Sequence, residues 1–198
     1  IDNNANVTTD NGNITLSADN MLLFGGNIDN DNLSGTGRVT LQPITAGHNI
    51  NLGVSNNTDG DFLLGLSDAD LATIKTDGVL TVGNVNIVDD IIVNADIGFD
   101  GNFDATKLTL RAGTGNGDEA VDSNTLDTDG GNPFSIGNTI TDLAIESGGS
   151  VGAGGNLHTN VDNLAIVVNA TNNDGGNITI TEDNALNVAN VDNIAGMT

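Results

Sequence analysis

The sequence predicts an all-β protein of the parallel β-helix, or β-solenoid, class. Short apolar–polar alternations recur along the chain, turn residues separate them, and one triplet returns at a spacing typical of solenoids. Leu143-Ala144-Ile145 returns as Leu164-Ala165-Ile166 after 21 residues, and solenoid repeats run to roughly 20–30 residues or more. We expect one β-solenoid domain over 1–198 with about eight coils, and a β-sandwich or jelly roll is the alternative.

Each predicted strand holds a triplet in which two apolar residues flank a small or polar one. Because successive side chains of a strand point to opposite faces, such a triplet buries one face. The first strand, for example, places Ile14 and Leu16 on one face and Thr15 on the other. In chain order the predicted strands are 12–16, 38–41, 48–52, 78–82, 107–110, 142–145, 163–166 and 177–180.

Asn, Asp and Gly separate these strands, as in 10–12, 56–60 and 173–176. These residues tolerate left-handed backbone conformations and suit tight corners. The same turns could close hairpins. In a stack of coils, Asn side chains at some equivalent, inward-facing positions would lie about 4.8 Å apart and hydrogen-bond as ladders. The alternative is that Asn only fills surface loops.

Two segments depart from the strand pattern. Residues 67–75 begin with Ser67, carry Asp70 three residues later and space Leu71 and Ile74 as a helix does, which predicts one capped helical turn. Residues 112–138 are rich in Gly, Asp and Asn, which predicts a loop inserted in a coil. Neither 1–11 nor 190–198 differs in character from the interior coils, so no capping sequence is predicted at either end.

The composition excludes several classes of function. With 27 acidic and 4 basic residues the net charge is -23, so the chain lacks the basic clusters that bind nucleic acid or anionic membranes. No apolar run approaches the roughly 20 residues that span a bilayer, so membrane insertion is not expected. The charge alone would suit a disordered chain, but 37% of the residues are hydrophobic and they cluster in the alternating segments.

A stretch of about 40 residues resembles a known repeat. Ile44–Gly53 reads ITAGHNINLG, Leu64–Ile74 reads LGLSDADLATI, and Gly78–Gly83 reads GVLTVG. In this order they resemble the repeat of very large bacterial exoproteins of the filamentous haemagglutinin type, with Val82 where that repeat has Ile. The resemblance implies a right-handed parallel β-helix that is exported by a bacterial-type route and displayed at the cell surface or released.

Enzymatic chemistry is not expected, although some parallel β-helices cleave polysaccharides. Asn57-Thr58-Asp59 and Asp89-Asp90 resemble the acidic motifs of polygalacturonases, in which paired carboxylates act on a glycosidic bond. The downstream Gly-His-Gly and Arg-x-Lys of that family are missing. His48 and His158 lie far apart without a partner at metal-ligand spacing, and we expect His48 to be an exposed strand or corner residue.

Calcium is the one cofactor that the sequence suggests, and none is predicted to be required. Asp127, Asp129 and Asn132 supply alternating oxygen ligands around a Gly turn, and Asp174 belongs to a weaker version. Hard cations prefer such oxygens on a flexible loop. The complete calcium-loop and nonapeptide patterns are absent, and zero Cys excludes thiolate metal sites. A solvated loop is therefore the favoured interpretation.

These observations predict a non-enzymatic structural or adhesive segment of an extracellular or cell-surface fibre. The expected partners are a second copy of the chain, stacked head to tail, or the rest of a longer fibre. Surface glycans and host or neighbouring cells are the expected targets of adhesion. The alternative function is a carbohydrate-binding or carbohydrate-cleaving parallel β-helix.

Overall fold

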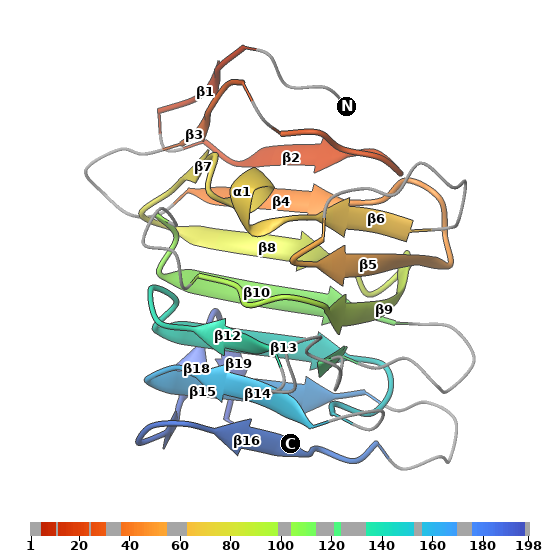
Figure 1. The fold of residues 1–198 in the computed structure, drawn as a ribbon, viewed down its shortest axis with the longest axis vertical. Coiled ribbons are helices and arrows are strands. Elements are labelled where there is room, and N and C mark those ends of the chain that lie inside the picture. The colour runs from red at the N-terminus through yellow and green to blue at the C-terminus, as the bar shows by residue number, and fades with distance from the viewer. Residues whose placement is uncertain are drawn as a thin grey trace.

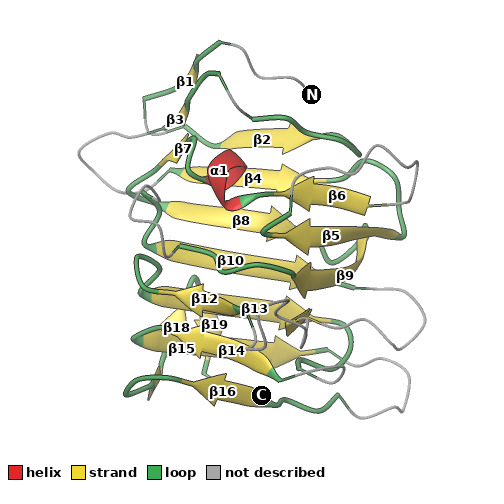
Figure 2. Ribbon diagram, in the orientation of Figure 1, coloured by secondary structure: helices red, strands yellow, loops and turns green. Residues whose placement is uncertain are grey.

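The computed structural model describes an all-β chain with one short helix, α1 (Asp68–Leu71) (Figure 2). The described residues are 5–10, 12–23, 25–30, 37–54, 63–98, 104–113, 121–123, 134–152, 156–169 and 176–196. Among them, no helix has the length and apolar character needed to cross a membrane.

A seven-stranded parallel sheet forms the spine of the molecule (Figure 1). Its strands are β2 (Ile14–Ser17), β4 (Arg38–Gln42), β8 (Val79–Gly83), β10 (Lys107–Ala112), β13 (Asp142–Ser147), β15 (Asn163–Val168) and β17 (Asn187–Val188). They stack in chain order, so each passage of the chain adds a strand beside the preceding one. We call this sheet the spine sheet.

Three smaller parallel sheets complete the stack. The first contains β6 (Leu63–Leu66), β5 (His48–Leu52), β9 (Val88–Val93) and β11 (Val121–Ser123). The second contains β1 (Val7–Thr8), β3 (Ile28–Asp29) and β7 (Ile74–Lys75), and the third contains β12 (Ser135–Gly137), β14 (Leu157–Asn160) and β16 (Ile180–Glu182). Parallel neighbours require long crossover connections, and here the other sheets provide them.

The register of the spine sheet places like residues over like. One inward row is wholly aliphatic and runs through Ile14, Val39, Leu80, Leu108, Leu143, Leu164 and Val188. The adjacent outward row consists of Thr15, Thr40, Thr81, Thr109, Ala144 and Ala165. This alternation is the one that the triplets predicted, and it sorts apolar side chains to one face of the sheet.

The inward side chains of the sheets form one continuous core. The largest cluster of buried residues includes Ile28 from β3, Leu80 from β8, Ile91 from β9 and Leu157 from β14, all fully buried. One member of each sheet therefore contributes to the same apolar interior. The stack is held together by burial of Leu, Ile and Val, at roughly 1.5–3 kcal/mol for each fully buried side chain.

Seven of the eight predicted strands are present, with small differences at their ends. The prediction of a strand over 177–180 is wrong. Ile178 forms only an isolated bridge with Val151, and β16 begins at Ile180. Two apolar residues at a spacing of two cannot distinguish one strand from a corner between two sheets, and here the chain passes from one sheet to the next.

The predicted helical turn is confirmed. Ser67 is the N-cap of α1, the backbone N–H of Asp70 donates to Ser67 Oγ at 3.1 Å, and the backbone N–H of Ser67 donates to Asp70 Oδ2 at 3.0 Å. Asp70 Oδ1 also accepts from the backbone N–H of Leu23 at 3.0 Å. The helical turn is thereby joined to a segment 47 residues away.

Amide contacts between neighbouring strands are present, but at half-buried or exposed positions and not at the inward-facing positions predicted. Asn187 donates to Asn163 at 2.9 Å, Asn184 donates to Asn160 at 2.6 Å, and Asn94 donates to Asn51. Each bond joins residues at least 20 positions apart in the chain, as stacking at equivalent positions requires.

The parallel pairing of the sheets does not fit the alternative of a β-sandwich or jelly roll, which is built from antiparallel strands. Within the range 112–138, predicted to be an inserted loop, β11 and β12 are short strands that stack on their neighbours. Residues 114–120 and 124–133 lie outside the described part of the chain, so the insertion itself stays a prediction.

Candidate functional site

The one antiparallel element among the described residues is a hairpin of β18 (Asn190–Val191) and β19 (Ile194–Ala195). Its two turn residues, Asp192 and Asn193, have φ angles of 49° and 65°. Positive φ at both central residues defines the type I′ turn that matches the twist of two-residue hairpins. Residues 190–195 therefore do not add a strand to the spine sheet, although 190–198 does not differ in sequence character from the interior coils.

The hairpin folds back over the outer face of the spine sheet. Val191 and Ile194 pack against Ala144 and Ala165, whose side chains are fully buried although they point outward from the sheet. After the hairpin the chain returns to the sheet, where the backbone N–H of Ile166 donates to the carbonyl of Gly196 at 2.6 Å. The hairpin thus follows β17, the last strand of the spine sheet, and the chain pairs with β15 again after it.

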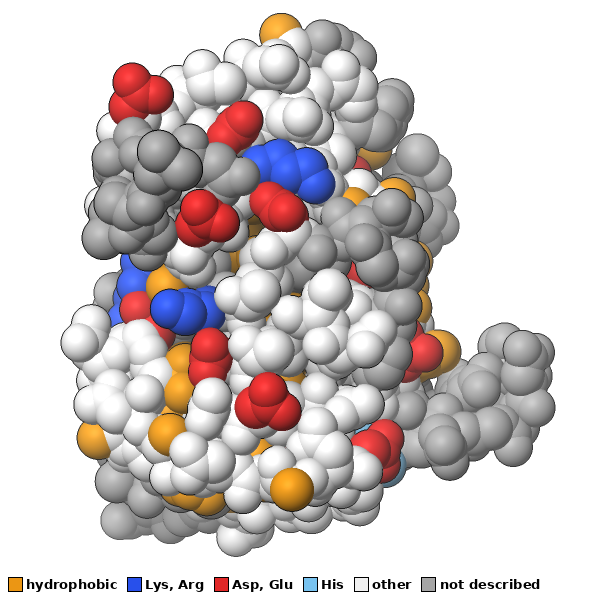
Figure 3. Space-filling view, turned by 90° about the vertical axis from the view of Figure 1, so that its left-hand side faces the viewer, with side chains coloured by type: hydrophobic (Ala, Val, Ile, Leu, Met, Phe, Trp, Pro, Cys, Tyr) orange, Lys and Arg blue, Asp and Glu red, His pale blue; other side chains and the backbone are white. Residues whose placement is uncertain are grey.

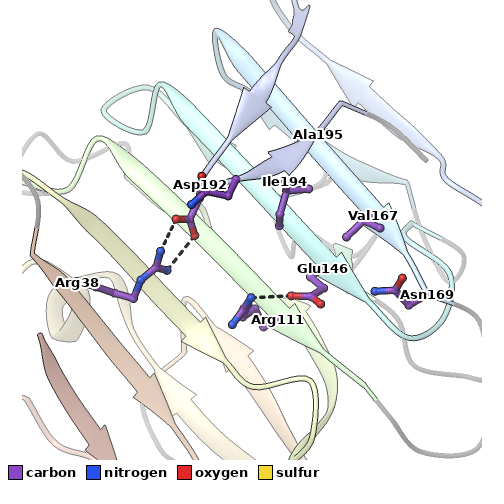
Figure 4. A pocket seen from close by; sticks show the side chains of 9 residues that line it. Arg38, Arg111, Glu146, Val167, Asn169, Asp192, Ile194 and Ala195 are labelled. Atoms are coloured by element: carbon purple, nitrogen blue, oxygen red, sulfur yellow. Dashed lines mark hydrogen bonds and ion pairs between the residues drawn. The ribbon is translucent and has the colours of Figure 1, made fainter.

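An ion pair fastens the tip of the hairpin to strands much earlier in the chain (Figure 4). Both terminal nitrogens of Arg38 donate to the Asp192 carboxylate, Nη1 to Oδ2 at 2.9 Å, and Thr109 Oγ1 donates to the same Oδ2 at 2.7 Å. Arg38 also donates to Thr81. The Asp192 side chain is 8% exposed, so this two-pronged contact is largely shielded from solvent.

The pKa of Asp192 reflects this environment. Burial of the carboxylate raises the pKa, but hydrogen bonds from Arg38 and Thr109 and the positive charges of Arg38 and Arg111 outweigh burial. The pKa of Asp192 is therefore lowered below its ordinary value, and the group is ionised wherever the protein is near neutral pH.

A pocket of about 620 Å³ lies between the hairpin and the outer face of the spine sheet. Arg111 and Glu146, opposite each other on β10 and β13, form a second ion pair at 2.8 Å within it. The lining residues are Arg38, Arg111, Glu146, Val167, Asn169, Asp192, Asn193, Ile194 and Ala195. Figure 4 shows charged side chains on one side and Val167, Ile194 and Ala195 on the other.

The chemistry of this pocket is that of a small polar-ligand site. Its volume lies within the roughly 300–1,000 Å³ of ligand pockets. Two guanidinium groups and two amides can donate hydrogen bonds, two carboxylates can accept them, and three aliphatic side chains offer an apolar wall. The charges balance within the pocket, in contrast to the net charge of -23 of the whole chain. Figure 3 shows acidic side chains on one face of the molecule, with Lys and Arg side chains beside some of them.

None of the sequence-predicted calcium ligands can be placed. Asp127, Asp129, Asn132 and Asp174 lie outside the described residues. In the part of the chain that the structure describes, no group of three or more His, Asp or Glu side chains is arranged to hold a metal ion. A calcium site therefore stays a prediction on the four residues named.

The two histidines are separated in the structure and do not line the pocket. His158 lies on β14, opposite Ser135 and Thr181. His48 lies on β5 with Nε2 3.9 Å from Asp19 Oδ1, and it is only 7% exposed, so the prediction of an exposed residue is wrong. The alternation of β5 places His48 on the same face as the buried Ile50 and Leu52, which is why it is covered.

The acidic motifs singled out in the sequence are not brought together with the pocket. Asp89 and Asp90 lie on β9, where the backbone N–H of Asp90 donates to Asn49 at 3.1 Å. Asn57, Thr58 and Asp59 are outside the described residues. Sequence reasoning missed the pocket entirely, and no sequence signal marks the hairpin, because the same apolar-Asp-Asn-apolar pattern at 161–164 leads into β15.

Comparison of the chain with protein-family models, with curated proteins and with solved structures found no match.

Proposed function

We propose that this chain is a right-handed parallel β-helix of about eight coils and that it serves as a non-enzymatic structural or adhesive segment of a secreted or cell-surface fibre. The observation that carries the proposal is the spine sheet. Seven parallel strands stack in chain order with like residues over like, which is the pattern of a chain that coils repeatedly around one core.

A stack of this kind suits a mechanical role. Each coil contacts only its neighbours, so the core extends along one axis and stability grows with each added coil. Backbone hydrogen bonds run along that axis between neighbouring strands, and the apolar rows are continuous through them. The acidic surface keeps neighbouring rods apart sideways, because like charges repel when salt does not screen them.

The proposal for the location rests on the resemblance to filamentous haemagglutinin-type repeats. The stretch that carries it, 44–83, begins between β4 and β5, ends with β8 and includes α1. We propose bacterial-type secretion, with a further copy or the rest of a longer fibre as structural partner, and surface glycans or host or neighbouring cells as the adhered surface.

Immunoelectron microscopy of cells that produce the natural gene product tests this function. An antibody raised against the purified chain should label fibres or material outside intact cells. Labelling that requires permeabilised cells would overturn the location. Small-angle scattering of the purified chain tests the shape separately, since a β-helix gives a rod with a constant cross-section.

Carbohydrate binding is a second candidate, and the pocket beside the hairpin favours it. Sugar hydroxyls both donate and accept hydrogen bonds, and Arg111, Glu146 and Asn169 offer both complements beside an apolar wall. Titration calorimetry with short neutral and acidic glycans tests it, with Arg111→Ala expected to weaken binding at least tenfold. Lys107→Ala, with the same charge change on the same strand but outside the pocket lining, is the control. An assay for new reducing ends distinguishes binding from cleavage.

A further inference from the structure

The ladder at the edge of the spine sheet has a fixed direction. Asn187 Nδ2 donates to Asn163 Oδ1 at 2.9 Å, and Asn163 Nδ2 donates to Asp142 Oδ1 at 2.7 Å. An ionised carboxylate only accepts, so Asp142 obliges Asn163 to present its amide nitrogen on that side. The oxygen of Asn163 then faces Asn187, and Asn187 in turn must donate toward Asn163.

This direction leaves an acceptor at the β17 edge of the spine sheet. The Asn187 nitrogen is used toward Asn163, so its oxygen is directed away from the stack, beyond β17. Among the described strands, β17 pairs only with β15. Val188 beside it continues the inward aliphatic row but is 51% exposed.

The opposite end of the same column has the complementary donor. Asn13 immediately precedes β2, and its Oδ1 accepts from the backbone N–H of Arg38 on the next strand at 3.1 Å. That bond turns the oxygen toward the stack and the Nδ2 group away from it. Within the described residues β2 pairs only with β4, and Ile14 begins the aliphatic row that Val188 ends.

We propose that a second copy of this chain docks end to end, with β17 of one copy pairing in parallel with β2 of the next. Val188 then lies opposite Ile14, and Asn13 Nδ2 donates to Asn187 Oδ1. This pairing extends the aliphatic row, the strand ladder and the amide ladder together. It rests on the fibre function proposed above and specifies the partner and the register of assembly.

Substitution of Asn13 tests the amide contact without disturbing the fold. Asn13→Asp keeps an oxygen that accepts from Arg38 but removes the outward donor and sets a carboxylate against the Asn187 oxygen. We expect it to weaken end-to-end association at least tenfold in sedimentation velocity at moderate salt. Asn86→Asp, at an exposed turn between β8 and β9, adds the same charge in the middle of the stack and should leave association within twofold of the parent chain.

Engineered disulfides test the register. In the proposed pairing Thr15 lies opposite Ala189 of the neighbouring copy, with Cα atoms about 4.8 Å apart, within the span that a disulfide bridges. The chain has no Cys of its own, so Thr15→Cys with Ala189→Cys should give a covalent ladder of oligomers on oxidation. Thr15→Cys with Asn86→Cys should not give that ladder.

The outcomes separate this inference from the fibre function. A covalent ladder together with Asn13→Asp sensitivity supports the register. A chain that stays monomeric at millimolar concentration, with no ladder, overturns the end-to-end pairing even if scattering shows a rod and antibodies label extracellular fibres. Equal association by Asn13→Asp and Asn86→Asp overturns the amide contact.

Discussion

At the scale of single residues, the pair of Arg38 and Asp192 is the contact that sequence spacing could least foretell. The two residues lie 154 positions apart, and they join the hairpin tip to β4. Removing one partner leaves the other without its charge complement in a shielded site, which costs more than an exposed pair contributes.

Asp192→Asn is therefore expected to lower the free energy of unfolding by about 2 kcal/mol. The measurement is urea denaturation at pH 7, with the exposed Asp183→Asn as the control for the loss of one negative charge. A variant as stable as the control would show that the ion pair contributes nothing to the native state.

The lowered pKa of Asp192 also sets the pH range of this effect. Because the pKa is lower in the folded than in the unfolded chain, ionisation stabilises the folded state above the unfolded value of about 3.9. The difference in stability between the parent chain and Asp192→Asn should be constant above about pH 5 and shrink as the pH falls through the folded pKa. A difference that grows on acidification would contradict this assignment.

Gly78 illustrates how closely successive passages of the chain approach each other just before β8. A Cβ atom on Gly78 would lie 1.7 Å from the carbonyl oxygen of Gly37, a backbone atom that cannot rotate away. We expect Gly78→Ala to cost about 3 kcal/mol of unfolding free energy. Gly47→Ala, at a φ of 78° with nothing within 4 Å, should cost only about 1 kcal/mol from backbone strain. Equal losses would show that the close approach of Gly78 to Gly37 is not the constraint.

At the scale of elements, the Asp70 side chain has two roles in α1. It completes the capping box with Ser67, and it binds the backbone of Leu23, which is distant in the sequence. Ser67 serves only the helical turn, whereas Asp70 also accepts from the backbone of Leu23, a buried residue. Ser67→Ala should cost about 1 kcal/mol, the usual loss of an N-cap. Asp70→Ala should cost about 3 kcal/mol, because it also leaves the Leu23 N–H buried without an acceptor. Thermal unfolding of both variants checks the order, and equal losses would mean that the Leu23 contact is unimportant.

The strands and the hairpin differ in how far they could be predicted. A spine strand is visible in the sequence because its buried face repeats every second residue. The hairpin at 190–195 contains the same residue types, Asn, Val and Ile, as the spine strands. It differs from them only in its turn conformation and in the part of the sheet on which it packs. Both depend on Ala144 and Ala165 leaving a shallow surface on which Val191 and Ile194 can pack.

At the scale of the whole molecule, the net charge of -23 is the dominant property of the surface. Calcium at millimolar concentration should raise the melting temperature by less than about 15 °C through screening alone, and magnesium should do about the same. A larger rise with calcium that magnesium does not reproduce would show a specific site, with Asp127, Asp129, Asn132 and Asp174 the residues to replace. Differential scanning calorimetry with each cation makes the comparison.

The predicted stack and the predicted amide contacts rested on repetition, and repetition is readable from a single chain. Like residues at like positions of Leu143-Ala144-Ile145 and Leu164-Ala165-Ile166 lie in register in the structure. The pocket depends on no repetition. Arg111 and Glu146 are outward residues of β10 and β13 with no distinguishing sequence pattern. They line a pocket only because the hairpin covers the sheet beside them.

The sequence by itself determined which side chains face the core, because alternation along a strand is a local property that every stacked neighbour repeats. The tertiary structure alone decided which outward residues are covered and which distant charges meet. Those outcomes depend on where the chain folds back on itself. The hairpin with its turn at Asp192-Asn193 buries Ala144, pairs Arg38 with Asp192 and forms one wall of the pocket. No periodicity in the chain encodes the place on the sheet where this hairpin packs.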